Sequence, residues 1–312
     1  MPSIYTVTLN PALDKTVHVP NFTVDQVNRI NWLRRDAGGK GINVSKVIAK
    51  LGGESTAIAV LAGQTGQWIA NTLDENNIKV HAITVPGETR TNLKVVDTKG
   101  GTNTDINEPG PEVNDSVLDQ ALIDVVSKTS AGDIVVLSGS LPHGASTNIY
   151  GRWTRALHDA GLKVYLDADG AALSAGLEQK PYFTKPNDHE LSAMLGRELA
   201  DVDAIATAAS EIVAGGIDTI CISMGGNGAV YATTSEVWYA GPVKVKVGST
   251  VGAGDSVVAA FAFAHAQGLS TEDTLRLAMA TGAANVMESG TQAAERSVVD
   301  SLIKKVQLTR LR

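Results

Sequence analysis

A glycine turn between two very different stretches constrains this chain more than any other feature. Residues 243–247 alternate valine with lysine, and residues 256–264 are apolar and rich in alanine. This order predicts a strand, a tight turn over residues 249–255 and then a buried helix. Because Gly252 and Gly254 have no side chain, an anion can lie directly on the backbone at the positive end of that helix. The turn is therefore a candidate anion site.

Asp255 ends the turn and allows two interpretations. A carboxylate in the first turn of a helix commonly interacts with the helix dipole or caps the free amides. Beside an anion it would instead repel the ligand, unless it had a chemical task such as accepting the proton of an attacking hydroxyl. The residues of this turn alone do not decide between capping and catalysis.

Two further motifs combine polar residues with a predicted helix start. The Gly-Gly-Lys-Gly-Ile-Asn stretch at 38–43 leads into apolar positions at helical spacing, and it lacks the Ser or Thr that a Walker A loop requires. Its Lys40 can contact a phosphate or hydroxyl, or simply be exposed. Asn187 and Glu190 lie one turn apart at a second helix start, where they can form a capping box or bind a ligand together.

The rest of the chain alternates strand and helix patterns. Buried parallel strands read as apolar runs, as at residues 133–137, and strand-helix units in succession predict a mainly parallel sheet with helices on both faces. Two segments, about 12–36 and 85–108, lack this alternation. The second contains two short strand patterns joined by a turn at residues 99–101, so we expect these inserts to form a small β lid.

Composition excludes several classes of protein. A net charge of -7 and a pI near 5.4 argue against a nucleic-acid partner. The single cysteine, Cys221, precludes an intrachain disulfide and suits the cytosol. With no signal-peptide pattern and no apolar run near the ~20 residues of a membrane helix, we expect a cytoplasmic protein without a membrane partner.

The three motifs, which follow one another along the chain at 38–43, 187–190 and 249–255, resemble those of the ribokinase-like (PfkB) family of carbohydrate kinases. The resemblance extends from Thr6 to about Ser297. It implies a three-layer α/β/α sandwich with a mainly parallel central sheet, as a single domain over residues 1–312. It also implies ATP as co-substrate, Mg²⁺, a β lid over the sugar site and a homodimer formed through that lid.

The resemblance also assigns roles to individual residues. Asp255 is the expected catalytic base, and the amides of Gly252, Ala253 and Gly254 are the expected stabilisers of the transferred phosphoryl group. The residues expected at the sugar, besides Asp255, are Asp14, Gly39, Lys40, Asn43, Arg90, Ser138 and Gly139. Those expected at the nucleotide are Lys185, Asn187, Ser223, Gly225, Gly226, Gly228, Ser249, Thr250, Gly252 and Gly254. Asn187 and Glu190 are expected to organise Mg²⁺, partly through water.

One departure narrows the expected acceptor. Many family members have Asp-Thr before the Gly-Ala-Gly-Asp run, whereas this chain has Ser249-Thr250. That difference, together with Arg90 in a Thr-Arg-Thr-Asn stretch, resembles the branch that acts on phosphorylated sugars. A guanidinium matches a phosphate in bidentate fashion, although Arg90 can also be a solvated lid residue.

Within that branch, the lid stretches 89–94 and 104–110 most resemble those of members that act on fructose 1-phosphate. The resemblance therefore implies phosphorylation of its 6-hydroxyl, which gives fructose 1,6-bisphosphate. Tagatose 6-phosphate and fructose 6-phosphate remain alternative acceptors. A kinase of nucleosides or unphosphorylated sugars is disfavoured by Arg90, Lys40 and Ser249. A sugar-phosphate sensor without activity is the alternative from another class, and the intact Asp255 argues against it.

Overall fold

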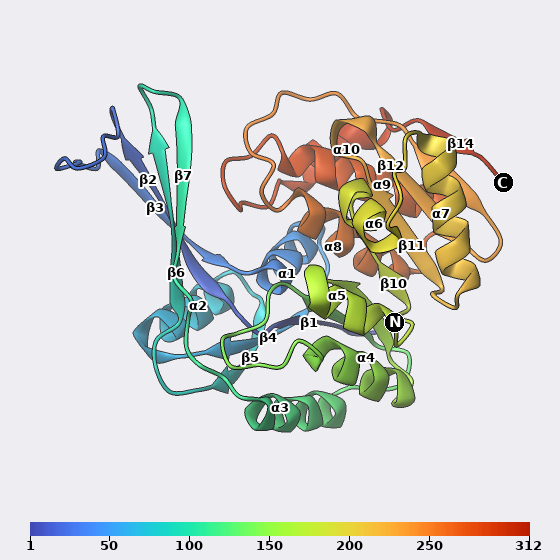
Figure 1. Cartoon of the computed structure of the whole chain (residues 1–312), viewed down its shortest axis with the longest axis horizontal. Coiled ribbons are helices and arrows are strands. Elements are labelled where there is room, and N and C mark those ends of the chain that lie inside the picture. Colours follow the sequence, from blue (N-terminus) through green and yellow to red (C-terminus); the bar gives the residue numbers. More distant parts are fainter.

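The computed structural model describes residues 1–312 and contains two sheets (Figure 1). The main sheet has ten strands in the order β14-β13-β12-β11-β10-β9-β8-β1-β4-β5. Its strands are β1 (Ile4–Thr8), β4 (Thr56–Leu61), β5 (Lys79–Thr84), β8 (Ile134–Ser138), β9 (Lys163–Asp167), β10 (Phe183–Thr184), β11 (Thr219–Ser223), β12 (Ala229–Thr233), β13 (Val237–Ala240) and β14 (Leu308–Arg310).

Most neighbouring strands of the main sheet run parallel to each other. From β5 to β11 all neighbours pair in parallel, and only β12, β13 and β14 add antiparallel pairs at one edge. Every residue of β8 is buried, as expected for a parallel strand covered on both faces. The predicted α/β class with a mainly parallel sheet is confirmed.

Ten helices cover the two faces of the main sheet. The buried clusters place α1, α2, α8, α9 and α10 on one face and α3 to α7 on the other. Their bounds are α1 (Lys40–Lys50), α2 (Gly63–Glu75), α3 (Asp115–Lys128), α4 (Ile149–Asp159), α5 (Gly170–Leu177), α6 (Asp188–Leu195), α7 (Val202–Ala214), α8 (Ala253–Gln267), α9 (Thr271–Asn285) and α10 (Arg296–Ile303). None of them combines the length and the hydropathy that crossing a bilayer requires.

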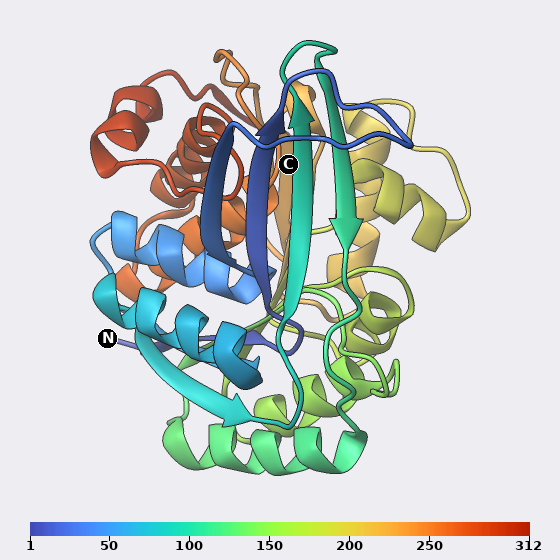
Figure 2. The ribbon, with the colours of Figure 1, turned by 90° about the vertical axis from the view of Figure 1, so that its left-hand side faces the viewer.

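The second sheet, which we call the lid sheet, stands away from the main body and shows its full width in Figure 2. Its four strands, in the order β3-β2-β6-β7, are β2 (Ala12–Val19), β3 (Trp32–Gly38), β6 (Arg90–Asp97) and β7 (Thr102–Asn107). The central pair β2-β6 is parallel and the two outer pairs are antiparallel. These strands come from the two inserts at 12–36 and 85–108, with β3 ending two residues beyond the first.

The predicted strand at residues 243–247 is wrong. Val243 and Val245 pack against the main core, but Val247 is exposed and no strand pairs with this segment. The alternation of valine and lysine here therefore reflects burial of one side of an extended segment that forms no hydrogen-bonded strand pair. The short helix α5 and the strands β5, β13 and β14 were not anticipated from the sequence.

Candidate active site

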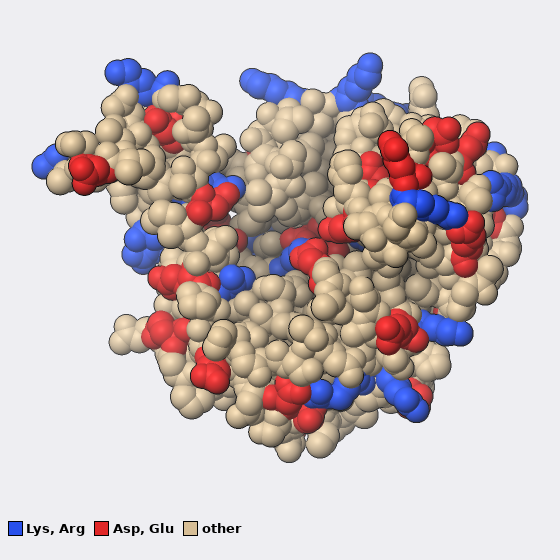
Figure 3. All heavy atoms as spheres, in the orientation of Figure 1, with Lys and Arg blue, Asp and Glu red and all other residues tan.

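A cavity of about 420 Å³ lies between the lid sheet and the carboxyl ends of the main-sheet strands. Figure 3 shows a hollow in this region, with acidic and basic side chains gathered around it. The strand order reverses beside β1, because β4 and β5 lie on one side of it and β8 on the other, and such a point is where open α/β sheets bind ligands. The predicted residues that line the cavity are Asp14, Gly39, Lys40, Asn43, Arg90, Gly139, Gly252 and Asp255.

Asp255 does not cap the helix in which it lies. The N-cap of α8 is Gly252, with φ at 79°, and no side chain caps this helix start. The carboxylate of Asp255 instead accepts a hydrogen bond from Asn43 Nδ2 at 2.9 Å. The capping interpretation is therefore wrong for Asp255, and the amides of Gly254 and Asp255 stay available to an anion, whereas that of Ala253 donates to the Thr250 carbonyl at 3.4 Å.

Burial makes Asp255 a stronger base than an exposed carboxylate. Desolvation, reinforced by the nearby charge of Asp167, raises the pKa of Asp255 to about 6, while Asn43, Lys40 and Lys185 act in the opposite direction. A general base works best when its pKa lies near the operating pH. Asp255 is thus suited to accept a proton near neutral pH.

Two lysines approach this acidic centre from different elements. Lys40 Nζ, at the start of α1, lies 3.7 Å from Asp167 Oδ1 and 3.5 Å from Asp169 Oδ1. Lys185, after β10, is buried and lies 3.9 Å from Asp167 Oδ1. A Cβ at Gly254 would lie 3.1 Å from Lys185 Nζ, so a larger residue there would require the lysine to move slightly from the start of α8.

Several buried polar atoms around the cavity have no partner. Four of the eight such side-chain atoms in the molecule belong to residues that line it: Thr8 Oγ1, Asn43 Oδ1, Arg90 Nε and Asn92 Oδ1. A buried polar atom without a hydrogen bond is costly, so native proteins rarely contain one without a reason. A polar ligand in the cavity would supply these partners.

Arg90 is held by one end only. Its Nη2 donates to the carbonyl oxygen of Asn10 at 3.2 Å, whereas Nε is unpaired, and burial lowers the pKa of the guanidinium. The unused donors can form the fork that suits a phosphate group. Arg90 is accordingly no solvated lid residue.

Asp14 lies in the lid strand β2, beside the carboxyl end of β1. Asn92 Nδ2 donates to its Oδ1 at 3.0 Å and Thr291 Oγ1 to its Oδ2 at 3.4 Å. A Cβ at Gly38 would lie 2.2 Å from Asp14 Oδ2, so the carboxylate rests directly on the glycine backbone. Burial raises the pKa of Asp14.

Apart from Gly252, the residues expected at the nucleotide do not line this cavity. Asn187 and Glu190 open α6 with a complete capping box: Asn187 Oδ1 accepts from the Glu190 amide at 2.7 Å and Glu190 Oε2 from the Asn187 amide at 2.9 Å. Ser223 pairs with Asn187 in a β-bridge, which places the ends of β10 and β11 side by side. No group of three or more His, Cys, Asp or Glu side chains forms a ready-made metal site.

The glycine turn after β11 has a structural cause of its own. A Cβ at Gly228, whose φ is 91°, would lie 2.1 Å from the carbonyl oxygen of Ala240. Gly225 also has a positive φ of 53°, whereas Gly226 faces open space. The turn between β11 and β12 therefore requires glycine whether or not a ligand binds there.

Some expected residues lie behind the site. Ser138 is fully buried and its hydroxyl lies 3.5 Å from Asp167, so it supports the cavity without lining it. Ala253, Gly254, Ser249 and Thr250 do not line the cavity either and surround the start of α8.

Sequence reasoning missed several residues of the cavity. Asn10, Asn92, Lys94, Asp169 and Thr291 line it, and Asp167 lies beneath it. Position after a parallel strand could have identified Asp167 and Asp169, and alternation from Arg90 could have identified Asn92 and Lys94. Nothing local marks Thr291, which reaches Asp14 across 277 positions of sequence.

Comparison with known proteins supports this arrangement. Residues 7–297 match the pfkB family carbohydrate kinase domain. The chain is 37% identical over 310 residues to 1-phosphofructokinase of Bacillus subtilis, covering 99% of this chain and 100% of that protein. It is 36% identical over 310 residues to 1-phosphofructokinase of Haemophilus influenzae, with 99% of both chains covered.

Solved structures agree with the sequence relatives on the fold. Phosphofructokinase-2 of Escherichia coli in complex with potassium superposes with a TM-score of 0.92 at 34% identity, covering 98% of this chain and 99% of that one. The same Escherichia coli protein has been solved with fructose-6-phosphate, with a TM-score of 0.91 and 32% identity over 98% and 99% of the two chains. With its motifs, its fold and its relatives in agreement, this chain belongs to the pfkB family of carbohydrate kinases.

Proposed function

We propose that this chain transfers the γ-phosphoryl group of ATP to the 6-hydroxyl of D-fructose 1-phosphate, giving D-fructose 1,6-bisphosphate and ADP. One observation carries the proposal. Asp255, a carboxylate with a raised pKa, lies at a helix start without a side-chain cap. The polar cavity that it lines also contains buried polar atoms without hydrogen-bond partners, which a polar ligand would satisfy. The full-length similarity to 1-phosphofructokinases supports the choice of acceptor.

Asp255 and the start of α8 divide the chemistry between them. Asn43 holds one carboxylate oxygen of Asp255, so the other can accept the proton of the attacking hydroxyl. The amides at the start of α8 and the ammonium groups of Lys40 and Lys185 face the region where negative charge moves during transfer. Positioning and charge neutralisation are most of what phosphoryl transfer needs.

The acceptor has a natural orientation in the cavity. Arg90 lies on the lid sheet, with free donors for a phosphate, whereas Asp255 lies at the floor. Asp14, Asn43 and Asn92 line the same cavity and offer polar side-chain atoms for hydrogen bonds with the sugar hydroxyls. Lys40 is a second cation at the sugar and could bind the same phosphate as Arg90, but its contacts with Asp167 and Asp169 favour a role near the transferred phosphoryl group.

ATP would lie at the carboxyl ends of β10 and β11, along the capping box of α6 and the glycine turn. The proposed contacts are Lys185, Asn187, Ser223, Gly225, Gly226, Gly228, Ser249 and Thr250. Mg²⁺ typically binds one or two carboxylates, several waters and the substrate phosphates, so it does not need a dedicated protein cage. Glu190 Oε2 serves the cap, which leaves its second oxygen for a metal-bound water. When bound, Mg²⁺ neutralises phosphate charge.

The lid sheet also offers a surface for a second copy of the chain. The edge strands of the lid sheet carry exposed apolar residues, which are Trp32 and Leu33 on β3 and Ile106 on β7. We therefore propose that the chain forms a homodimer through the lid sheet. We also propose that it acts in the cytoplasm. Sedimentation of Leu33→Asp against the native chain tests it, and an unchanged mass would remove the lid from the interface.

The test of function compares acceptors under identical conditions. ADP release should be fastest, by kcat/KM, with fructose 1-phosphate, ahead of fructose 6-phosphate and tagatose 6-phosphate. A clear preference for either 6-phosphate would change the acceptor and keep the kinase. No ADP release with any of the three would favour a sugar-phosphate sensor. Arg90→Ala should chiefly raise KM for the sugar phosphate, and an effect confined to ATP would reverse the placement of the two substrates.

A further inference from the structure

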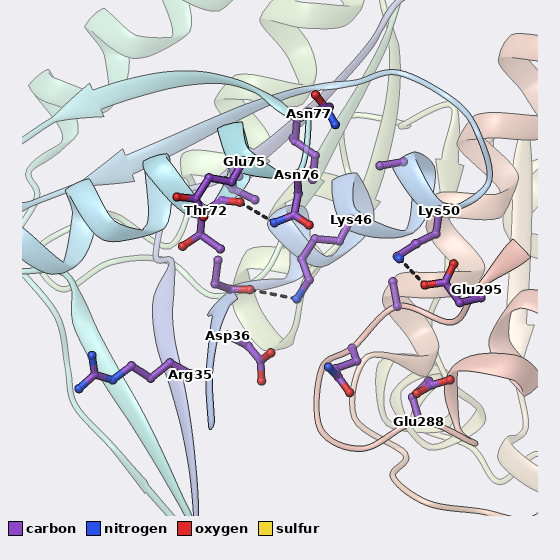
Figure 4. A pocket seen from close by; sticks show the side chains of 16 residues that line it. Arg35, Asp36, Lys46, Lys50, Thr72, Glu75, Asn76, Asn77, Glu288 and Glu295 are labelled. Carbon is purple, nitrogen blue, oxygen red and sulfur yellow. Dashed lines mark hydrogen bonds and ion pairs between the residues drawn. The ribbon is translucent and has the colours of Figure 1, made fainter. Parts of the chain in front are cut away.

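Lys46 lies between two cavities and lines only one of them. The front cavity is the cavity of about 420 Å³ described above. A second cavity of about 580 Å³, which we call the rear cavity, is lined by Lys46 and fifteen other residues (Figure 4). The two cavities share no lining residue, and Lys46 belongs to the rear one. A substrate in the front cavity therefore does not touch Lys46.

Its ammonium nevertheless joins two parts of the front wall. Lys46 Nζ donates to the carbonyl oxygen of Ala37, at the end of lid strand β3, at 3.1 Å, and to that of Thr291 at 3.0 Å. The Asp14 carboxylate rests on Gly38, the residue after Ala37, and the Thr291 hydroxyl donates to Asp14. One acceptor of Lys46 thus belongs to a residue that bonds Asp14, and the other belongs to the residue next to the glycine on which Asp14 rests.

Lys46 is one of the positive charges that act on Asp14. Asp36, opposite Asp14 on β3, is paired with Arg34 at 2.7 Å, whereas the charge of Arg90 also interacts with Asp14 from the lid side. Lys46 makes no ion pair within 4 Å, so its charge is not consumed by another carboxylate. Burial lowers the pKa of Lys46, while Asp36, Asp14 and Asp255 favour its charged form.

The position on α1 fits this role. Lys40, Asn43 and Lys46 follow one another at intervals of three residues, so each lies about 60° further round α1 than the one before it, and the three reach neighbouring parts of the site. Lys40 faces the acidic pair Asp167 and Asp169, Asn43 holds Asp255, and Lys46 reaches the supports of Asp14.

Resting on the proposed function, we propose that Lys46 is a positioning residue that fixes Asp14, and so the sugar phosphate, through the Ala37 and Thr291 carbonyls. It does not take part in the transfer itself. Its loss should weaken binding of the acceptor and leave the nucleotide and the base largely undisturbed.

The experiment measures KM and kcat separately for Lys46→Met, with Lys46→Arg as the conservative rescue. Lys46→Met should raise KM for fructose 1-phosphate about tenfold, with KM for ATP within about twofold, because a charged buried donor is lost. Lys46→Arg should restore most of the affinity, since a guanidinium can donate to both carbonyls. Lys50→Met is the matched control, because Lys50 lies on the same helix, lines the same rear cavity and pairs only with Glu295.

A double variant decides whether Lys46 acts through Asp14. In an Asp14→Asn background, Lys46→Met should cause little further change in KM. An equal rise in both backgrounds, or an unchanged KM in the single variant, would overturn the proposal. If Lys46→Met does not fold, Lys46→Gln permits the same comparison, because it keeps a donor and lacks the charge. Failure of the native chain to release ADP with fructose 1-phosphate would instead reject the proposed function.

Discussion

Two helices at the site begin with an acid at the same position and use it in opposite ways. Glu190 is the third residue of α6 and Asp255 the third residue of α8. Glu190 turns back and closes a capping box with Asn187. Asp255 follows a glycine N-cap that has no side chain to offer, and its carboxylate lies against Asn43 of another helix.

The difference lies in the N-cap residue. The Asn187 side chain accepts the Glu190 amide, and the Asn187 amide donates to the Glu190 carboxylate, so both residues find their partners within one turn. Gly252 can adopt its positive φ of 79° without strain, and it leaves the first amides of α8 without a side-chain acceptor. A closed helix start stabilises the fold, whereas an open one keeps its donors and its acid for a ligand.

Asp255→Asn should have the largest effect, because it removes the acid from the open helix start. If Asp255 is the base, kcat should fall by ~10²–10⁴, while the affinity for ATP changes little. Steady-state kinetics of ADP release, with nucleotide binding measured by calorimetry, provide the comparison.

Stability provides the control for that variant. An asparagine at this position keeps an acceptor for Asn43 Nδ2, and it removes a carboxylate whose burial is unfavourable. Thermal unfolding should therefore show no loss of stability. Near-normal turnover by a folded variant would show that Asp255 is not the base.

The pH dependence of turnover should show the same contrast. Because burial raises the pKa of Asp255 to about 6, the acid is protonated, and unable to accept a proton, at a pH where an ordinary carboxylate is ionised. Lowering the pH through 6 should therefore reduce kcat/KM by about tenfold per unit once below the pKa. A rate that stays level down to pH 5, in protein that remains folded, would contradict this assignment.

Much of this architecture could be predicted from local patterns. The apolar run ending at Ser138 indicates a parallel strand, the polar inserts indicate a separate sheet, and glycine before an alanine-rich stretch indicates the open start of α8. Each of these signals is contained within about ten consecutive residues, where strand and helix periodicities operate.

The long-range part of the site had no such signal. The hydrogen bond from Asn43 to Asp255 spans 212 positions and that from Thr291 to Asp14 spans 277. Whether Asp255 faced its own helix or another one depended on that packing, so the sequence left both interpretations open. The valine alternation at 243–247 failed for a related reason, since burial on one side does not ensure a neighbouring strand.

Glu190→Gln should have the smallest effect and tests the closed helix start. Glutamine can still accept the Asn187 amide, so the capping box and the stability of the fold should be retained to within ~0.5 kcal/mol. If Glu190 also organises Mg²⁺ through its second oxygen, losing the charge should increase the magnesium concentration needed for half-maximal rate by several-fold, at unchanged thermal stability. Asn187→Ala is the matched comparison, because it removes the cap and should cost ~0.5–2 kcal/mol in a denaturant titration. An unchanged magnesium titration in Glu190→Gln would assign Glu190 to capping alone, and the two helix starts would then differ completely in use.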